Sequence, residues 1–567
     1  MEFYFVELLG VIGLGNLVMM FIVVAIVFGS YHFLTKNKRK LEKFRKEWET
    51  GEFFARNEDD KSVSMYWENK KNSNPNYDGV DQLTWDDIDM HTVFQKINYT
   101  QTSVGSEYLF NQLRDINPTL ENIQDEEELY ELLGNNQALR EEILLILSGL
   151  GKKDYTNSSS FFYEDYSKIK YAAIYVLLAL LPFASIFLMF YDLKYGILSL
   201  AGSFLINTTI YYKNKPKLEN NLYSASYIAA IINTGKHFAS IKHPQFTNFS
   251  NEFRNNVEPI KKVLVLDNFA SIGRGGGDFD AIFEYIRILF LLDFLSYNNI
   301  IKTISNNKVE FRELWELIGQ LDAGIAVAFY RKSLNTYCTP TFVEKEELSF
   351  KNMFHPLIKN PVTNSSIIGK STLITGSNAS GKSTYIKAMA INAILAQTIH
   401  TVLAESWTMK PSYIVTSMAI QDNVLDGDSY FIAEIKSLKR IIQLCEQGKP
   451  CISFIDEILK GTNTIERIAA SASIMEWLSL NKGMNIIASH DIELTVMASK
   501  VYMNYHFSES IENGKVYFDY TIHPGPSKTR NAIKLLEILD YPENITNKAT
   551  KLAEYFTESH EWGVMKD

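Results

Sequence analysis

The chain has 567 residues, of which 46% are hydrophobic and 22% are charged, and its formal net charge is −10. This length provides for several domains, and the acidic balance excludes the overall basic footprint of a strong, non-specific nucleic-acid binder. The three cysteines, Cys338, Cys445 and Cys451, lack metal-ligand spacing, so we expect them to be reduced and structural, which excludes a disulfide scaffold.

An apolar run lies near the N-terminus. Leu8–Leu34 is interrupted only by Asn16 and small residues, and it is long enough to cross a hydrocarbon core of about 30 Å. No Lys or Arg precedes this run, whereas seven basic residues follow it between Lys36 and Lys46. The positive-inside rule therefore predicts a membrane anchor with its N-terminus outside and the rest of the chain in the cytoplasm.

Two more apolar stretches lie in the first half of the chain. Tyr171–Tyr191 and Tyr195–Tyr212 are separated only by Asp192–Lys194, and lysines flank the pair. This pattern predicts a transmembrane helical hairpin with its basic ends inside, which makes three spans and a multi-pass protein of the inner, or cytoplasmic, membrane. A pair of buried core helices is the alternative interpretation of the hairpin.

A phosphate-binding pattern, G-x-x-x-x-G-K-[ST], follows the strand candidate Ser371–Thr375 and precedes a helix expected from about Ser383. Its nine residues are Gly376, Ser377, Asn378, Ala379, Ser380, Gly381, Lys382, Ser383 and Thr384. In such a loop the backbone N–H groups surround the α- and β-phosphates, Lys382 reaches the β- and γ-phosphates, and Ser383 ligates Mg²⁺. The pattern predicts binding of ATP or GTP.

A second element predicts hydrolysis. Cys451–Ile455 has the pattern of a buried strand and ends in Asp456 and Glu457, as a Walker B strand does. Asp456 would hold the Mg²⁺, and Glu457 would polarise the attacking water, so the pair supplies a metal ligand and a base at the γ-phosphate.

Three further motifs occur in fixed order around these two elements. They are Gly427-Asp-Ser429-Tyr-Phe431-Ile-Ala-Glu434, Lys460-Gly-Thr-Asn-Thr464, and Ala488-Ser-His490-Asp-Ile-Glu-Leu-Thr495. With the phosphate loop, they make residues 350–560 resemble the ATPase domain of the MutS family. The sequence departs from the family pattern at Ser377, where Pro is usual, and at Lys460, where Arg is common.

The resemblance implies a composite active site at a homodimer interface. Gly427, Ser429, Phe431 and Glu434 would contact the γ-phosphate of the partner's ATP, and His490 would be the switch histidine. A neutral imidazole at a strand end can accept from or donate to the lytic water or the γ-phosphate. The candidate catalytic residues are therefore Lys382, Glu457 and His490, with ATP and Mg²⁺ as the implied ligands.

The resemblance is weaker upstream, where Leu83–His91 and Thr102–Leu109 are similar to the start of the MutS core, and Phe354–Leu357 is similar to the segment that enters the ATPase domain. We therefore expect an all-α core, or lever, domain followed by an α/β P-loop domain of the ABC/MutS type. The expected segments are an anchor (1–35), a basic helix and polar linker (36–80), the first part of the core (81–167), the hairpin (168–213), the second part of the core (214–349), the ATPase domain (350–540) and a C-terminal helical segment (541–567).

The family's mismatch-reading and connector domains have no counterpart before this core. Phe162-Tyr163-Glu164 spells the family's base-stacking motif, but it follows the first core segment, and we attribute it to coincidence. The resemblance implies ATP-coupled DNA binding in repair or recombination. Two alternatives stay open, an ATP-gated membrane scaffold or remodelling protein without DNA, and, more weakly, an ABC transporter.

Overall fold

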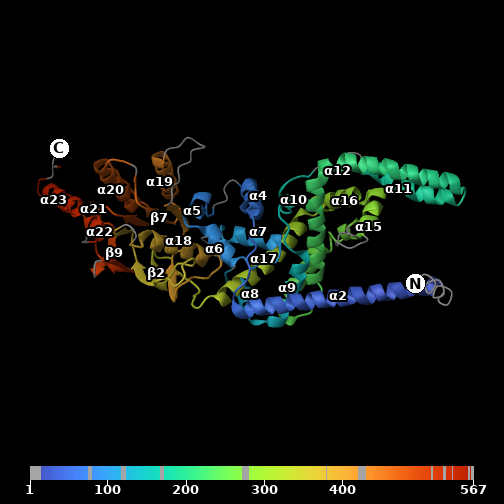
Figure 1. The fold of residues 1–567 in the computed structure, drawn as a ribbon, viewed down its shortest axis with the longest axis horizontal. Helices are drawn as coiled ribbons and strands as arrows, with labels where there is room; N and C mark the ends of the chain where they lie inside the picture. The colour runs from blue at the N-terminus through green and yellow to red at the C-terminus, as the bar shows by residue number, and fades with distance from the viewer. Residues whose placement is uncertain are drawn as a thin grey trace. The chain divides into compact units, whose positions relative to one another are not determined.

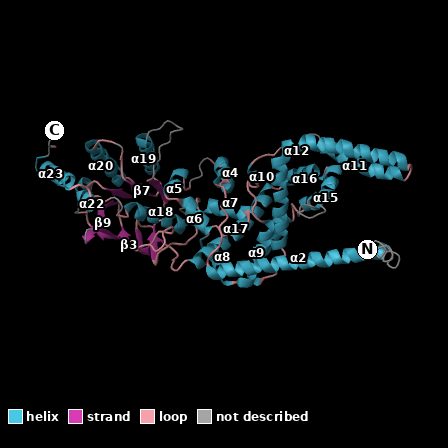
Figure 2. Ribbon diagram, viewed as in Figure 1, coloured by secondary structure: helices cyan, strands magenta, loops and turns pink. Residues whose placement is uncertain are grey.

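The computed structural model describes residues 14–74, 79–116, 123–166, 172–270, 280–377, 380–418, 430–460, 462–512, 515–527, 532–538, 540–559 and 562. The chain divides into two compact units. The helical unit comprises Met1–Ser73, Asn98–Leu109 and Glu128–Ser333, and the α/β unit comprises Asn74–Ile97, Phe110–Glu127 and Leu334–Asp567. The strands of the described residues all belong to the α/β unit (Figure 2).

The helical unit is built from long helices with short connections (Figure 1). Its helices are α2 (Leu14–Thr50), α3 (Asp60–Val63), α4 (Met65–Ser73), α7 (Ser103–Gln112), α8 (Ile123–Asn135), α9 (Gln137–Leu150), α10 (Ser160–Tyr163), α11 (Ala172–Met189), α12 (Leu193–Phe238), η1 (Pro244–Phe246), α13 (Thr247–Val257), α14 (Val263–Ala270), α15 (Asp280–Leu289), α16 (Leu292–Asn306) and α17 (Lys308–Ser333). The ends of α7 and α8 extend into segments of the α/β unit.

A buried carboxylate organises the centre of the helical unit. Asp322 of α17 is fully buried and accepts hydrogen bonds from the backbone N–H groups of Gln101 and Thr102, both at 2.8 Å, and from the Thr102 hydroxyl at 2.6 Å. These donors lie at the N-terminus of α7, where a carboxylate satisfies free N–H groups. A Cβ atom on Gly105 would lie 2.2 Å from the Asp322 carboxylate, so only glycine fits there.

The Phe162-Tyr163-Glu164 tripeptide lies inside the helical unit. Phe162 is buried, and its ring lies 5.9 Å from the rings of Phe311 and Trp315. A ring packed in this way is part of the core, which agrees with the interpretation that its resemblance to a base-stacking motif is coincidental.

Helices α11 and α12 form a hairpin whose polar groups face inward. Ser185 of α11 and Ser199 of α12 share a hydrogen bond of 2.8 Å, and Ser203 and Asn207 of α12 are buried. A Cβ atom on Gly196 would lie 2.6 Å from the Met189 backbone, so the helices approach closely near the tip.

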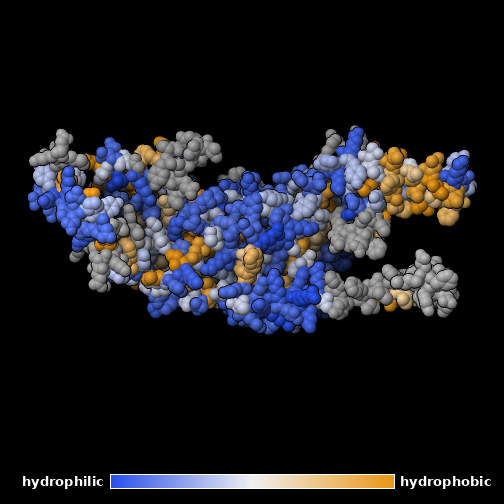
Figure 3. Space-filling view, in the orientation of Figure 1, coloured by the Kyte–Doolittle hydropathy of each residue, from blue (hydrophilic) through white to orange (hydrophobic). Residues whose placement is uncertain are grey.

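The outer surface of the hairpin is apolar, as Figure 3 shows. Its exposed side chains include Leu177, Leu180, Phe183, Phe187, Phe190, Leu193, Ile197, Leu198, Leu205 and Ile206. This arrangement is the inverse of a helical pair in water, where apolar side chains fill the interface and polar ones face the solvent.

Among the described residues, one helix, Ala172–Met189, is long and apolar enough to cross a membrane by length and composition. The prediction of three spans is therefore not supported. Tyr195–Tyr212, with Asn207 and two threonines, is the first part of a single 46-residue helix that continues into a lysine-rich segment. Much of Leu8–Leu34 lies outside the residues whose side chains are described.

The α/β unit contains a six-stranded sheet in the order β10-β9-β4-β8-β7-β6 and a four-stranded sheet in the order β1-β5-β2-β3. The strands are β1 (Thr341–Phe342), β2 (Leu348–Met353), β3 (Asn364–Ile368), β4 (Thr372–Thr375), β5 (Ser406–Met409), β6 (Tyr413–Ser417), β7 (Cys451–Asp456), β8 (Met484–Ser489), β9 (Met503–Glu512) and β10 (Lys515–Pro524). The helices are α5 (Gln82–Asp87), α6 (Met90–Ile97), α18 (Lys382–Thr398), α19 (Tyr430–Glu446), α20 (Thr464–Leu480), α21 (Ile492–Met497), α22 (Ala532–Ile538) and α23 (Glu543–Ser559).

The larger sheet is parallel except at one edge. Strands β9, β4, β8, β7 and β6 pair in parallel, and β10 pairs antiparallel to β9. The carboxyl ends of β4, β7 and β8 therefore lie at the same edge of the sheet, which is where ligands bind in open α/β folds. The residues that follow these strands are Gly376, Glu457 and His490.

Helix α5 covers the other edge strand, β6, although some 330 residues separate them in sequence. The Asp87 carboxylate accepts hydrogen bonds from the Thr416 hydroxyl at 2.6 Å and from the Met418 N–H at 3.0 Å, and the Thr84 hydroxyl accepts from the Thr416 N–H. These bonds satisfy backbone groups that an edge strand would otherwise expose. The α/β unit thus begins well before residue 350, where the sequence places the start of the ATPase domain.

Candidate functional site

The phosphate-loop pattern lies between β4 and α18, in the strand–loop–helix context that the sequence predicts. Gly376 and Gly381 have φ angles of 153° and 103°, in the region that favours glycine. A Cβ atom on Gly376 would lie 2.9 Å from the Ser380 hydroxyl and 3.1 Å from the Phe507 carbonyl. Asn378 and Ala379, which the sequence places in the loop, lie outside the described residues.

Lys382 is buried at the first position of α18 and points back across the loop. Its Nζ donates to the carbonyl oxygens of Gly376 at 2.7 Å and Ser377 at 2.8 Å. Burial lowers the pKa of Lys382, while the carboxylates of Glu457, Asp456 and Glu509 act in the opposite direction. The Lys382 ammonium therefore lies within the loop, where it could contact the oxygens of a bound polyphosphate.

Glu457 follows β7 in an unusual backbone conformation. Its φ angle is 67°, and its N–H donates to the Ala488 carbonyl of β8 at 3.0 Å. Positive φ angles in non-glycine residues are uncommon and concentrate at functional sites. The conformation keeps Glu457 beside the end of β8, where His490 follows.

Glu457 and His490 form a hydrogen-bonded pair. The distance between Glu457 Oε1 and His490 Nδ1 is 3.0 Å, and the Lys460 ammonium lies 3.7 Å from Glu457 Oε2. The hydrogen bond with His490 is the main cause that lowers the pKa of Glu457, and the same bond raises the pKa of His490 against the effect of burial. The Glu457 carboxylate is therefore held ionised and in a fixed orientation.

A second ion pair, which sequence reasoning missed, lies behind the first. Arg467 of α20 donates to Asp491 through Nη2 at 2.7 Å and Nε at 3.1 Å, and Asp491 Oδ1 is 3.6 Å from His490 Nε2. Two parallel bonds between guanidinium and carboxylate fix the geometry of both groups. The sequence signal was weak, because Arg467 and Asp491 lie 24 positions apart.

The segment predicted to contact a partner's ATP is described only in part. Gly427 and Ser429 lie outside the described residues, and Phe431 packs against the core beside β7 and α20. Glu434 is 2% exposed, and its Oε1 accepts from the Lys460 N–H at 3.0 Å. Glu434 therefore lies against the loop that follows β7, and its expected contact with a partner's ATP stays a prediction.

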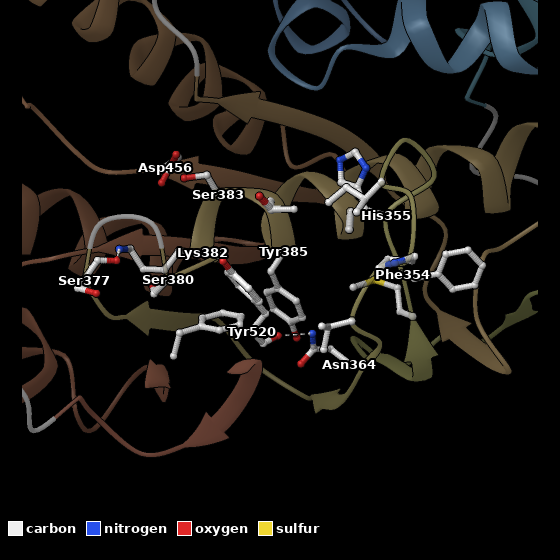
Figure 4. A pocket seen from close by; sticks show the side chains of 18 of the residues that line it. Phe354, His355, Asn364, Ser377, Ser380, Lys382, Ser383, Tyr385, Asp456 and Tyr520 are labelled. Carbon is white, nitrogen blue, oxygen red and sulfur yellow. Dashed lines mark hydrogen bonds between the residues drawn. The ribbon is translucent and has the colours of Figure 1, made fainter. Parts of the chain in front are cut away.

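A cavity of about 820 Å³ joins the phosphate loop to Asp456 and Glu457, and His490 is not among its lining residues (Figure 4). Its phosphate-side lining includes Ser377, Ser380, Lys382, Ser383, Asp456, Glu457 and Lys460. The Ser383 hydroxyl points toward the Asp456 carboxylate (Figure 4). The Ser380 hydroxyl is buried in this half and has no hydrogen-bond partner among the described residues.

The other half of the cavity is aromatic and apolar, and the sequence did not predict it. Its lining includes Met353, His355, Ile358, Val362, Tyr385, Phe507 and Tyr520. Tyr520 has a φ angle of 52°, and its ring would lie 3.1 Å from a Cβ atom on Gly381, so it borders the phosphate loop. His355 accepts from the Leu357 N–H through Nδ1 at 3.2 Å, and burial lowers its pKa to about 4, so its ring is neutral.

Asp456 and Ser383 suit a hard divalent cation. Carboxylate and hydroxyl oxygens are the ligands that Mg²⁺ takes in nucleotide sites, together with phosphate oxygens and water. Within the described ranges, no group of three or more His, Cys, Asp or Glu could hold a metal on its own. This donor set therefore fits a Mg²⁺ that arrives with a nucleotide.

Residues 372–557 match the family model for MutS domain V. The chain is 28% identical over 274 residues to the DNA mismatch repair protein MutS of Lactobacillus delbrueckii subsp. bulgaricus, which covers 46% of this chain and 32% of that protein. It is 32% identical over 233 residues to the MutS protein of Lactobacillus acidophilus, with 38% and 27% covered. The chain thus matches about a third or less of the length of these relatives, and the similarity to MutS proteins includes the segment that matches domain V.

Proposed function

We propose that the α/β unit binds MgATP in this cavity and hydrolyses it. The main observation behind this proposal is that Lys382, Asp456 and Glu457 line one cavity. This cavity lies at the carboxyl edge of a parallel sheet. The loop amides and Lys382 would hold the phosphates, because phosphate oxygens can replace the carbonyls that Lys382 now contacts. Ser383 and Asp456 would hold the Mg²⁺, which supplies charge neutralisation at the β- and γ-phosphates.

Glu457 would direct the attacking water. Its ionised carboxylate can accept a hydrogen bond from water, whose oxygen attacks the γ-phosphorus as the bond to the bridging oxygen breaks, giving ADP and phosphate. His490 bonds to the same carboxylate, so its role in this arrangement is to hold Glu457 in position. Lys382 and Glu457 remain the proposed catalytic residues, and His490, proposed from the sequence as a third, acts as a positioning residue.

The aromatic half of the cavity would hold the base. Tyr520 offers a partly exposed ring, and Ile358 and Val362 offer apolar contacts. A planar base gains stacking energy from such a wall.

The resemblance to MutS supports a homodimer with two composite sites and a role for ATP turnover in DNA repair or recombination. The named relatives are DNA mismatch repair proteins, and the segment around Gly427 and Ser429 would complete the partner's site. The alternative, a scaffold or remodelling protein that does not bind DNA, is favoured by the net charge of −10 and by the apolar hairpin.

The inverted polarity of the hairpin supports insertion of α11 and the first part of α12 into a lipid bilayer. Exposed leucines and phenylalanines face outward and serines and Asn207 face inward, which suits a hydrocarbon solvent. Lys213 and Lys215 follow the apolar part of α12, so the positive-inside rule places the base of the hairpin, and the ATPase with it, on the cytoplasmic side. We propose a cytoplasmic-membrane location on this basis.

The experiment that tests the function is ATP turnover by the detergent-solubilised chain, alone and with duplex, mismatched or branched DNA. Lys382→Ala is the inactive control. Turnover that DNA changes supports the repair role, whereas turnover that Lys382→Ala abolishes but no DNA form alters favours the scaffold. Turnover that survives Lys382→Ala would contradict the assignment of this cavity.

A further inference from the structure

Helix α15 ends against the apolar hairpin. The ring of Phe290, which follows α15, lies 4.8 Å from the ring of Phe183 in α11, and the rings of Tyr285 and Phe204 lie 6.2 Å apart. Leu291 then adopts a φ angle of 49°, and the chain turns into α16. The segment is therefore a helix–turn–helix whose turn touches α11.

The position of the Phe183–Phe290 contact along α11 gives its depth in a bilayer that α11 would span. At 1.5 Å per residue, Phe183 lies about 16 Å from the start of α11, which is roughly half of a hydrocarbon core of about 30 Å. If α11 spans the bilayer, the turn after α15 lies deep within the apolar layer and not at its surface.

One amide joins the turn to the hairpin. Asn207 Nδ2 donates to the Leu178 carbonyl at 3.0 Å and to the Leu289 carbonyl at 2.6 Å. Leu178 lies four residues before Pro182, which has no N–H to offer it, and Leu289 is the last residue of α15. Asn207 therefore satisfies two carbonyls that helix interruptions have left without intrahelical donors.

Hydrogen bonds to such carbonyls stabilise a protein most where no water can replace them. An unsatisfied backbone carbonyl in hydrocarbon costs several kcal/mol, so irregular backbone enters a membrane only where protein groups satisfy it. Asn207 is 0% exposed and provides that satisfaction for both α11 and α15.

The apolar surface of the hairpin continues onto α15. Ile288 and Leu291 pack inward with Tyr211 and Phe294, whereas Tyr285 is 60% exposed and Ile286 is also exposed. Glu284 is exposed beside them, so the uncovered apolar area of α15 is confined to Tyr285 and Ile286, which need a second apolar environment. The exposed leucines and phenylalanines of the hairpin share that requirement.

We propose that α15 and its turn into α16 form a re-entrant element that dips into the cytoplasmic leaflet beside the hairpin, with acyl chains as the partner of Tyr285 and Ile286. This inference rests on the proposed insertion of the hairpin. The Leu289–Leu292 turn enters the bilayer and returns, anchored by Asn207.

Depth-dependent quenching tests the proposal. Single cysteines replace Tyr285, the hairpin residue Leu198 or the polar surface residue Glu142, and each full-length protein carries a bimane label in bilayers of brominated lipid. The unsubstituted protein gives the background from the native cysteines. We expect the labels at 285 and 198 to be quenched at least twofold more than the label at 142.

The two proposals fail in different ways. Quenching at 198 without quenching at 285 overturns the re-entrant element and leaves the inserted hairpin intact. Absence of quenching at both positions overturns the insertion itself.

Asn207→Leu tests the anchor, because it keeps the hairpin apolar and removes both hydrogen bonds. We expect quenching at 285 to fall by about half or more while quenching at 198 is unchanged. Asn214→Leu is the matched control, because Asn214 lies two turns further along α12 and, within the described part of the chain, donates to the Ile210 carbonyl of its own helix. Quenching at 285 that Asn207→Leu leaves unchanged would overturn the role of Asn207.

Discussion

At the scale of single residues, the site depends on a carboxylate whose backbone and side chain are both constrained. The positive φ of Glu457 and its bond to the Ala488 carbonyl set the backbone, and His490 sets the side chain. Arg467 in turn fixes Asp491, the neighbour of His490. A base held in this way needs little reorganisation before it acts on water.

Glu457→Gln should lower the pKa of His490. The bond to Glu457 is the main cause that raises this pKa, and burial, which lowers it, would then dominate. A raised histidine pKa means that the stabilisation from the pair is complete below the unfolded pKa of about 6.5 and is lost as pH rises through the folded value. Histidine-selective NMR titration measures the change, with the other histidines as internal controls; a His490 pKa that stays the same or rises would contradict the pairing.

Tyr520→Ala should raise the KM for ATP about tenfold, or about 1.4 kcal/mol, and change kcat little, because the ring stacks on the base and not on the reacting phosphate. Tyr517→Ala is the matched control, since Tyr517 lies on the same strand, is similarly exposed and does not line the cavity. Equal KM values for the two variants would place the base elsewhere.

At the scale of elements, α5 belongs to the sheet although the chain places it far upstream. Asp87→Ala should reduce the free energy of unfolding of the α/β unit by about 1–3 kcal/mol, because the buried Thr416 hydroxyl and Met418 N–H lose their acceptor. Asp86→Ala provides the control, because Asp86 is exposed on the same helix and should change stability by less than about 0.5 kcal/mol. Denaturant unfolding of both variants decides the question, and equal midpoints would show that α5 does not support β6.

Two glycines of the helical unit should respond to alanine substitution with opposite changes in the free energy of unfolding. Gly105→Ala should destabilise the unit by about 1–3 kcal/mol or more, because the new Cβ would overlap the Asp322 carboxylate. Gly149→Ala should stabilise it by up to about 1 kcal/mol, because nothing lies within 4 Å of the new Cβ and alanine favours the helix. Thermal unfolding of the two variants gives the signs, and a stabilising Gly105→Ala would refute the close packing at Asp322.

At the scale of the whole molecule, the sequence predicts the elements and motifs that short stretches of residues determine. The strand–loop–helix around Lys382, the strand that ends at Asp456, and a helix in the C-terminal segment 541–567 follow from short patterns, and the structure has them. The contacts that the sequence missed join distant segments, as Arg467 does with Asp491, Thr84 with Thr416, and Tyr520 with Gly381. Nothing in a local pattern specifies such partners.

The orientation of side chains in the hairpin is a second feature that the local sequence does not determine. Composition alone predicted apolar helices at Tyr171–Tyr191 and Tyr195–Tyr212, but it could not show that their serines and Asn207 face inward. That arrangement depends on the pairing of the two helices, and it supports the proposed insertion of the hairpin into lipid.

The most direct test of the account is a single-turnover measurement with γ-labelled ATP and Mg²⁺ on the full-length protein and its Glu457→Gln variant. Both proteins should bind ATP with similar affinity, because Lys382, the loop amides and Tyr520 are unchanged. The parent protein should release labelled phosphate, and the variant should retain intact ATP with its rate reduced at least about a hundredfold. Hydrolysis by Glu457→Gln at the parent rate, or failure of both proteins to bind ATP, would contradict the claim that this cavity is an ATPase site.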